Sequence, residues 1–157
     1  MSSHNVANLN SKTFGTRLSA HPSGYVNLSG NNGLAEQWEW QWISPNKFFW
    51  KSKAYGTYLR AWPDGHLDLT TNRDAWEVWT KHDCGSHIFW QSHFGTFLCS
   101  NPNNTVCLTG NKLAHEFWTH WGCKFSLKIL TRIFYRCVEI LCLLTILFIT
   151  WILIYFI

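Results

Sequence analysis

Alternating apolar and polar residues mark several short segments in the first 121 residues of the chain. The stretches YVNL (25–28), HLDL (66–69) and TVCL (105–108) alternate in this way, which is the period of a half-buried β-strand. Each follows a turn sequence that begins with proline: PSG, PDG or PNN. The segments VANLN, KFFWKS and SHIFWQS predict further strands upstream of these turns, and no long helical pattern occurs before residue 124. The pattern therefore predicts an all-β structure for this part of the chain.

The same pattern occurs three times. Counted from Gly15, Gly56 and Gly95, which are 41 and 39 residues apart, the three copies align without a gap over 24 residues. Eight positions are identical in all copies: Gly15/Gly56/Gly95, Thr16/Thr57/Thr96, Leu18/Leu59/Leu98, Pro22/Pro63/Pro102, Leu28/Leu69/Leu108, Asn31/Asn72/Asn111, Glu36/Glu77/Glu116 and Trp38/Trp79/Trp118. The repeats span about 5–43, 44–84 and 85–121, and each holds four predicted strands.

A single four-stranded repeat of about 40 residues cannot bury its apolar face on its own. A propeller typically needs about 4–8 such units, whereas three of them can share one barrel that removes most free strand edges. We therefore expect residues 1–122 to form a β-trefoil of three four-stranded repeats. Glu36, Glu77 and Glu116 recur with the repeat, so we expect them to accept backbone N–H bonds where a strand begins, and not to act in catalysis.

The repeats also resemble a known family. The order aromatic–x–Ser, Gly–x–x–Leu, Gly–x–Val/Leu and Glu–x–Trp is similar to the trefoil repeats of the fascin family of actin cross-linkers, and to the smaller hisactophilins. The closest stretch is FWKSKAYGTYLRAWPDGHLDL (49–69), and the resemblance covers residues 5–121. It implies a non-catalytic module that contacts actin filaments or another protein. Fascins carry four trefoils in tandem where this chain has one, and hisactophilins are much richer in histidine.

Charge and composition exclude some functions. Residues 1–121 carry nine Lys and Arg against eight Asp and Glu, a net charge of +1, which argues against nucleic-acid binding because that needs clustered positive charge. No nucleophile–base pair, phosphate-binding loop or carboxylate dyad is visible, so we expect neither an enzyme nor a bound cofactor. His82, Cys84, His87, His120 and Cys123 are zinc-compatible residue types, but their spacing matches no standard site, and we predict no metal.

The second repeat holds the candidate partner-binding residues. Lys47, Lys51, Lys53 and Arg60 form the nearest approach to a basic patch and could attract an acidic filament such as actin; a solvated surface is the alternative. Trp62 has no tryptophan counterpart in the other repeats, nor do Trp40, Trp42 and Trp76, so such a ring could stack on a sugar, anchor a protein or simply pack. A carbohydrate-binding trefoil remains open, although lectins of the ricin type carry Gln–x–Trp. A structural domain without a ligand is the third possibility.

The two cysteines of the third-repeat hairpin raise a smaller question. Cys99 and Cys107 flank the turn at strand positions that we expect to face outward. A cross-strand bridge would be possible in an oxidising setting, but free thiols are favoured.

The last 35 residues differ sharply from the rest, since they contain neither glycine nor proline. Residues 123–136 form a basic segment with Lys124, Lys128, Arg132 and Arg136, and residues 137–157 are almost entirely apolar. About 20 apolar residues suffice to cross a bilayer as a helix. We therefore expect a transmembrane-type α-helix and a tail-anchored protein whose trefoil faces the cytosol. If the tail is not translated in the cell, the trefoil would lie in the cytoplasm or at the cytoskeleton.

Overall fold

The structure, a computed structural model, describes residues 5–121, and the chain divides into two units, residues 1–122 and 123–157. Twelve short strands run through the described part: β1 Val6–Ser11, β2 Arg17–Ala20, β3 Val26–Ser29, β4 Trp38–Ser44, β5 Lys47–Ser52, β6 Tyr58–Ala61, β7 Leu67–Thr70, β8 Val78–Asp83, β9 Ile88–Gln91, β10 Phe97–Ser100, β11 Val106–Thr109 and β12 Trp118–Trp121. Three single-turn 3₁₀ helices precede β4, β8 and β12: η1 Leu34–Glu36, η2 Ala75–Glu77 and η3 Ala114–Glu116.

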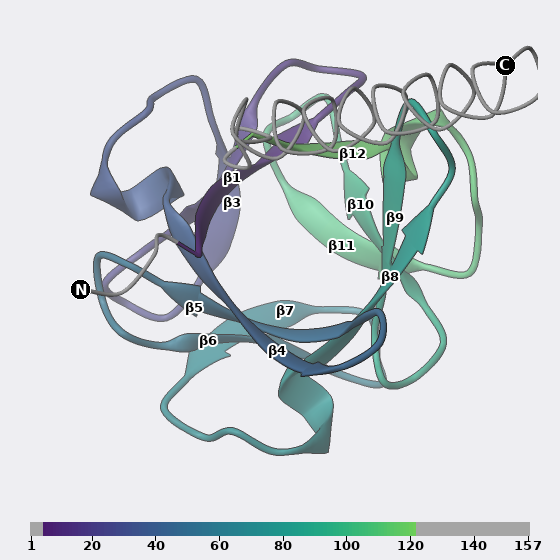
Figure 1. The fold of residues 1–157 in the computed structure, drawn as a ribbon. Coiled ribbons are helices and arrows are strands. Elements are labelled where there is room, and N and C mark those ends of the chain that lie inside the picture. Colours follow the sequence, from purple (N-terminus) through teal and green to yellow (C-terminus); the bar gives the residue numbers. More distant parts are fainter. Residues whose placement is uncertain (1–4, 122–157) are drawn as a thin grey trace, which may run out of the picture. The chain divides into compact units, whose positions relative to one another are not determined.

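Six of these strands close into a barrel. Neighbouring strands pair antiparallel in the cyclic order β1, β4, β5, β8, β9, β12 and back to β1 (Figure 1). The first and last strands thus pair directly, over Asn8–Trp121 to Ser11–Trp118. Closure leaves no free edge in this part of the sheet, which is how small β proteins avoid edge-to-edge association.

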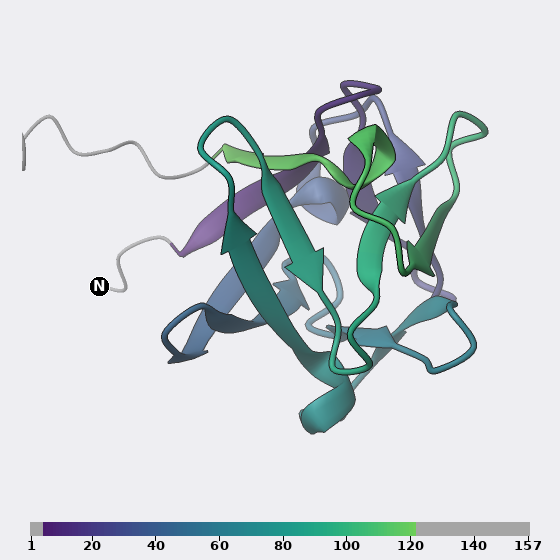
Figure 2. The same ribbon diagram turned by 90° about the vertical axis from the view of Figure 1, so that its right-hand side faces the viewer.

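The other six strands form three hairpins, β2–β3, β6–β7 and β10–β11, one in each repeat. Backbone bonds link them in a ring: Leu28 N–H donates to the Asn104 carbonyl (2.8 Å), and the corresponding bonds are Leu69 N–H to Gly24 O (2.7 Å) and Leu108 N–H to Gly65 O (2.8 Å). Figure 2 shows the hairpins together with the barrel strands from the side. Each repeat therefore depends on the other two for its hydrogen bonds.

The core is built mainly from positions that the repeats share. Trp38, Trp79 and Trp118 are fully buried, and so are Leu18, Leu59 and Leu98. Leu9, Trp50 and Trp90 add a further set at matching positions, with the Trp50 and Trp90 rings edge to face at 4.9 Å between centroids. Because buried side chains from all three repeats meet in one cluster, no repeat has a separate core.

The fold class predicted from the sequence, a β-trefoil with a C-terminal transmembrane-type α-helix, is wrong as stated. Residues 5–121 form a closed six-stranded barrel with twelve strands in all, and they contain no α-helix. No helix among these residues is long and apolar enough to cross a membrane. The terms transmembrane and tail-anchored therefore lack support. The apolar segment 137–157 that prompted them lies outside the described residues, as do Lys124, Lys128, Arg132 and Arg136.

One turn position has a left-handed backbone in all three repeats, and the residues found there are glycine or asparagine. Gly24 and Gly65 have φ of +91° and +94°, and the third repeat places Asn104 at the corresponding position with φ of +63°. A Cβ at Gly24 would meet only the Leu69 carbonyl oxygen, at an ordinary 3.7 Å. Space is therefore available, and only the left-handed backbone opposes a side chain there.

We expect Gly24→Ala to lower the free energy of unfolding by about 1–2 kcal/mol, because alanine is strained at positive φ. Gly24→Asn should cost less, since asparagine tolerates this region and already occupies it in the third repeat. The measurement is urea unfolding followed by tryptophan fluorescence. Gly30→Ala is the control, because Gly30 has neither a positive φ nor a neighbour within 4 Å. Equal losses for Ala and Asn at position 24 would contradict the explanation.

Candidate functional site

Three lysines predicted to contact a partner lie on β5 or directly after it. Lys47 and Lys51 alternate with the inward-facing residues of β5, so their side chains leave the barrel on its outer face, and Lys53 lies in the turn that follows the strand. Lys47 and Lys53 are exposed, while Lys51 is half-buried with its ammonium 5.9 Å from the centre of the Tyr58 ring. Within the described residues none of the three forms an ion pair with a carboxylate.

Arg60, the fourth residue of the predicted basic patch, is neutralised within the fold. Its guanidinium binds Asp68 through two bonds, Nε to Oδ1 at 2.8 Å and Nη2 to Oδ2 at 2.5 Å. The hydrogen bond to Asp68 raises the pKa of Arg60 above its ordinary value. Burial on its own would raise the pKa of Asp68, but the bonds and charge of Arg60 outweigh burial and lower it. The structure therefore separates Arg60 from the three unpaired lysines.

A cation that the sequence reasoning missed lies beside the lysines. The Arg73 guanidinium sits 4.6 Å from the centre of the Phe49 ring and covers it. The third repeat repeats the arrangement, with Lys112 4.6 Å from the Phe97 ring centre and 5.8 Å from that of Phe89. In both repeats the cation shields an outward-facing phenylalanine of the barrel, which explains why Phe49 is buried. The alignment of the repeats places Arg73 opposite Lys112, and this shared positive charge could have revealed the contact from the sequence.

The three repeated glutamates do accept backbone N–H groups. Their Oε2 atoms take the N–H of Gly33 (2.8 Å), Asp74 (2.7 Å) and Leu113 (2.7 Å), each at the start of a 3₁₀ turn. All three carboxylates are buried. They hold the loop that leads into β4, β8 or β12.

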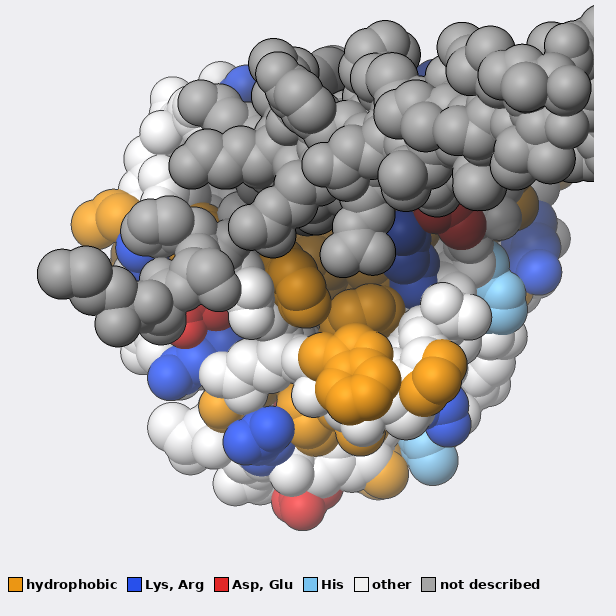
Figure 3. All heavy atoms as spheres, viewed as in Figure 1, with side chains coloured by type: hydrophobic (Ala, Val, Ile, Leu, Met, Phe, Trp, Pro, Cys, Tyr) orange, Lys and Arg blue, Asp and Glu red, His pale blue; other side chains and the backbone are white. Residues whose placement is uncertain are grey.

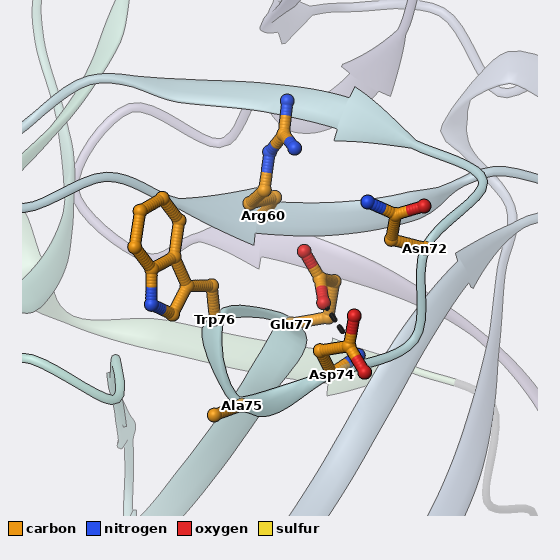
Figure 4. A pocket seen from close by; sticks show the side chains of 6 residues that line it. All are labelled: Arg60, Asn72, Asp74, Ala75, Trp76 and Glu77. Atoms are coloured by element: carbon orange, nitrogen blue, oxygen red, sulfur yellow. Dashed lines mark hydrogen bonds between the residues drawn. The ribbon is translucent and has the colours of Figure 1, made fainter.

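A pocket of about 330 Å³ opens beside one of these glutamates, in the second repeat. Its lining residues come from β6 and from the loop that leads through η2, as Figure 4 shows: Arg60, Asn72, Asp74, Ala75, Trp76 and Glu77. Trp76 is 36% exposed. Its ring meets those of Trp62 and Phe94 edge-on, at 5.1 and 5.4 Å between centroids. The pocket thus combines an accessible indole with carboxyl, amide and guanidinium groups.

Trp62, the ring singled out from the sequence, supports this pocket without lining it. Its indole stacks on His66 at 5.1 Å between centroids, and the Arg60 guanidinium lies 4.6 Å from its centre. These contacts and the one to Trp76 occupy the half-buried ring within the domain. Trp76 is therefore the better placed of the two to stack on a ligand.

Exposed apolar side chains also gather near the end of β4. Trp42 is 61% exposed and Ile43 37%, and Figure 3 shows hydrophobic side chains over this region with Lys and Arg side chains close by. Trp40 and Phe48 lie partly buried against the core, with their rings 5.9 Å apart. Of the unshared tryptophans, Trp40 therefore packs inside the barrel and Trp42 does not.

Histidine and cysteine side chains are dispersed. Among the described residues no three His, Cys, Asp or Glu come together as metal ligands, and His82 hydrogen-bonds Gln91 at 2.8 Å while His87 stacks on Phe117. Cys123 and the side chain of His120 lie outside the described part.

The expectation that Cys99 faces outward is wrong, because its thiol is buried beside Glu116. Burial, followed by a hydrogen bond to Glu116, raises the pKa of Cys99. Cys99 and Cys107 are cross-strand partners and both are free thiols.

No protein-family model and no curated protein matches this chain. The resemblance to fascins therefore stays a prediction, and the surfaces described above carry the functional argument. Two of them stand out, and both belong to the second repeat: the lysine row of β5 and the pocket beside Trp76.

The Arg60–Asp68 pair predicts a pH dependence of stability. The folded-state pKa of Asp68 lies below its ordinary value of 3.8, so the pair stabilises the fold above that pH and ceases to do so as the pH falls through the folded-state pKa. We expect Asp68→Asn to be less stable than wild type by about 1 kcal/mol at pH 7. The difference should shrink in acid, as measured by urea unfolding at several pH values.

The single variant Arg60→Met and the double variant Arg60→Met with Asp68→Asn complete a cycle that isolates the pair from the stacking of Arg60 on Trp62. A difference between Asp68→Asn and wild type that stays constant as the pH falls well below 3.8, or that grows in acid, would contradict the assignment.

Proposed function

We propose that residues 1–122 form a non-catalytic binding module that contacts an acidic protein surface, with the actin filament as the candidate partner. The observation that carries the proposal is the row formed by Lys47 and Lys51 on the outer face of β5 and by the exposed Lys53 just after it, none of which has an ion-pair partner among the described residues. The resemblance to fascins supports the choice of actin.

The electrostatics of this face favour such a partner. Arg73 lies against Phe49 on the same outer face of β5, so four positive charges border one strand. Charges act over about 8 Å at physiological salt, and a row of this kind therefore speeds encounter with an acidic surface more than it adds affinity. The cross-strand partner of Lys51 on β4 is the acidic residue Glu39.

Several other titratable groups of the domain have structural partners, which is in keeping with a non-catalytic role. The three buried glutamates hold loops by accepting backbone N–H bonds. Asp68 is bound to Arg60, and Lys81 to Asp83 at 3.0 Å. These groups serve the fold, and a single domain with one lysine row would bind one filament without cross-linking it.

Charge reversal at the ends of the row tests the proposal. Lys47→Glu with Lys53→Glu changes two exposed residues and leaves the contact of Lys51 with Tyr58 in place. We expect the full-length chain, kept dispersed in a non-ionic polyoxyethylene detergent because of its apolar C-terminal segment, to co-sediment with actin filaments. The double variant should bind about tenfold or more weakly, and wild-type binding should fall as salt rises.

The matched control is Lys12→Glu with Arg17→Glu, which makes the same change of charge on the first repeat. Near-UV circular dichroism confirms that each variant is folded. Sedimentation of wild type no greater than background would remove actin as the partner. Equal loss of binding in both double variants would show that net charge, and not the β5 row, is responsible.

A further inference from the structure

The three repeats differ in what faces their buried glutamate. In the first repeat the Ser19 hydroxyl donates to Glu36 Oε1 at 2.8 Å. The corresponding residue of the third repeat is Cys99, whose thiol is buried beside Glu116. In the second repeat the corresponding residue is Arg60, which turns to Asp68 instead. A side chain at this position thus donates to the glutamate in the first repeat and lies beside it in the third, whereas in the second repeat Arg60 binds Asp68 instead of Glu77.

Glu77 is left with one unsatisfied oxygen as a result. Its side chain is only 1% exposed. Oε2 accepts the Asp74 N–H at 2.7 Å, while Oε1 forms no hydrogen bond within the described structure. Figure 4 shows the second carboxylate oxygen directed into the space between Glu77 and Arg60, away from Asp74. Oε1 thus faces the pocket and is open to a hydrogen-bond donor from a ligand.

We propose that the pocket beside Trp76 binds a neutral sugar unit, one of whose hydroxyl groups donates to Glu77 Oε1. That hydroxyl takes the place that the Ser19 hydroxyl holds in the first repeat. The proposal is independent of filament binding, because the lysine row lies on the outer face of β5.

The remaining lining residues suit the same ligand. The exposed part of the Trp76 indole offers an apolar face for the C–H side of a sugar ring. Asn72 supplies both a donor and an acceptor, the Asp74 carboxylate accepts further hydroxyls, and Arg60 keeps N–H groups that are not used by Asp68. The volume of about 330 Å³ lies at the small end of the range for ligand sites, about 300–1,000 Å³, which fits one sugar unit.

The charge of the pocket selects among sugars. Asp74 and Glu77 bring two carboxyl groups, and the single cation, Arg60, is already paired with Asp68. An acidic sugar would bring a third carboxylate into this space, so we expect uronic and sialic acids to be rejected. Neutral hexoses and N-acetylhexosamines meet no such repulsion.

The test uses the full-length chain in a polyoxyethylene detergent, since detergents with sugar head groups would compete. Saturation-transfer NMR is run with the methyl glycosides of glucose, galactose, mannose and N-acetylglucosamine, and with methyl glucuronide. We expect saturation of at least one neutral glycoside and none of the glucuronide. Trp76→Ala and Glu77→Gln should weaken binding by about tenfold or more.

The repeats supply matched controls. Glu36→Gln makes the same buried change in the first repeat, and His115→Ala replaces the third-repeat counterpart of Trp76; both should leave the saturation unchanged. Arg60→Ser installs the hydroxyl of the first repeat next to Glu77, and should abolish glycoside binding in a chain that circular dichroism shows to be folded.

Three results would overturn the proposal. One is no saturation of any neutral glycoside, and another is undiminished saturation in Trp76→Ala. The third is saturation of N-acetyl-lysine methylamide in place of the glycosides, which would assign the pocket to an ammonium group. None of these results depends on the lysine row, so failure here and failure of filament binding are distinguished.

Discussion

One hydrogen bond, made three times, joins the two halves of this fold. The indole N–H groups of Trp38, Trp79 and Trp118 donate to the carbonyls of Leu18, Leu59 and Leu98 at 2.9, 3.0 and 2.8 Å. Each bond ties a barrel strand to the hairpin strand 20 residues earlier, so it fixes the hairpin on the barrel. An indole brings a large apolar area into the core, and burying its N–H without an acceptor is costly, as at Trp50 and Trp90, whose buried N–H groups have no partner in the described structure. Trp38, Trp79 and Trp118 each have an acceptor. The leucine carbonyl is that acceptor in every repeat.

This constraint explains which positions the repeats share. The tryptophan, the leucine whose carbonyl it meets and the glutamate two residues before the tryptophan all serve one junction. The glutamate holds the 3₁₀ turn that delivers the tryptophan to its strand, and the glycines at positive φ shape the turns around it. Positions outside this junction are free to differ, and they do: serine, arginine and cysteine occupy the residue next to the leucine.

The sequence predicted the repeats, the strands and the role of the glutamates, because identical residues at fixed spacing reveal a shared local mechanism. The three 3₁₀ turns were not anticipated, since single turns leave no periodic pattern. Strand alternation predicted that Cys99 faces outward. It could not show that this side of the hairpin packs against the loop that contains Glu116. The prediction that Arg60 belongs to the basic patch failed because its partner, Asp68, lies on the opposite strand of the hairpin, a pairing that strand alternation alone does not show.

The C-terminal α-helix was inferred from composition alone. In the described residues every element is a strand or a single 3₁₀ turn.

The surfaces that we propose to bind a partner or a sugar lie where the repeats differ. In the second repeat Arg60 takes the place of serine or cysteine, and its bond to Asp68 draws it away from Glu77. That one change leaves a carboxylate oxygen facing a pocket, and Trp76, where the other repeats have alanine and histidine, gives the pocket an apolar wall. The first and third repeats retain the shared junction and supply the rest of the closed barrel. Two repeats can therefore preserve the fold while the second diverges, because the indole–carbonyl bond at Trp79 does not involve any residue that lines the pocket.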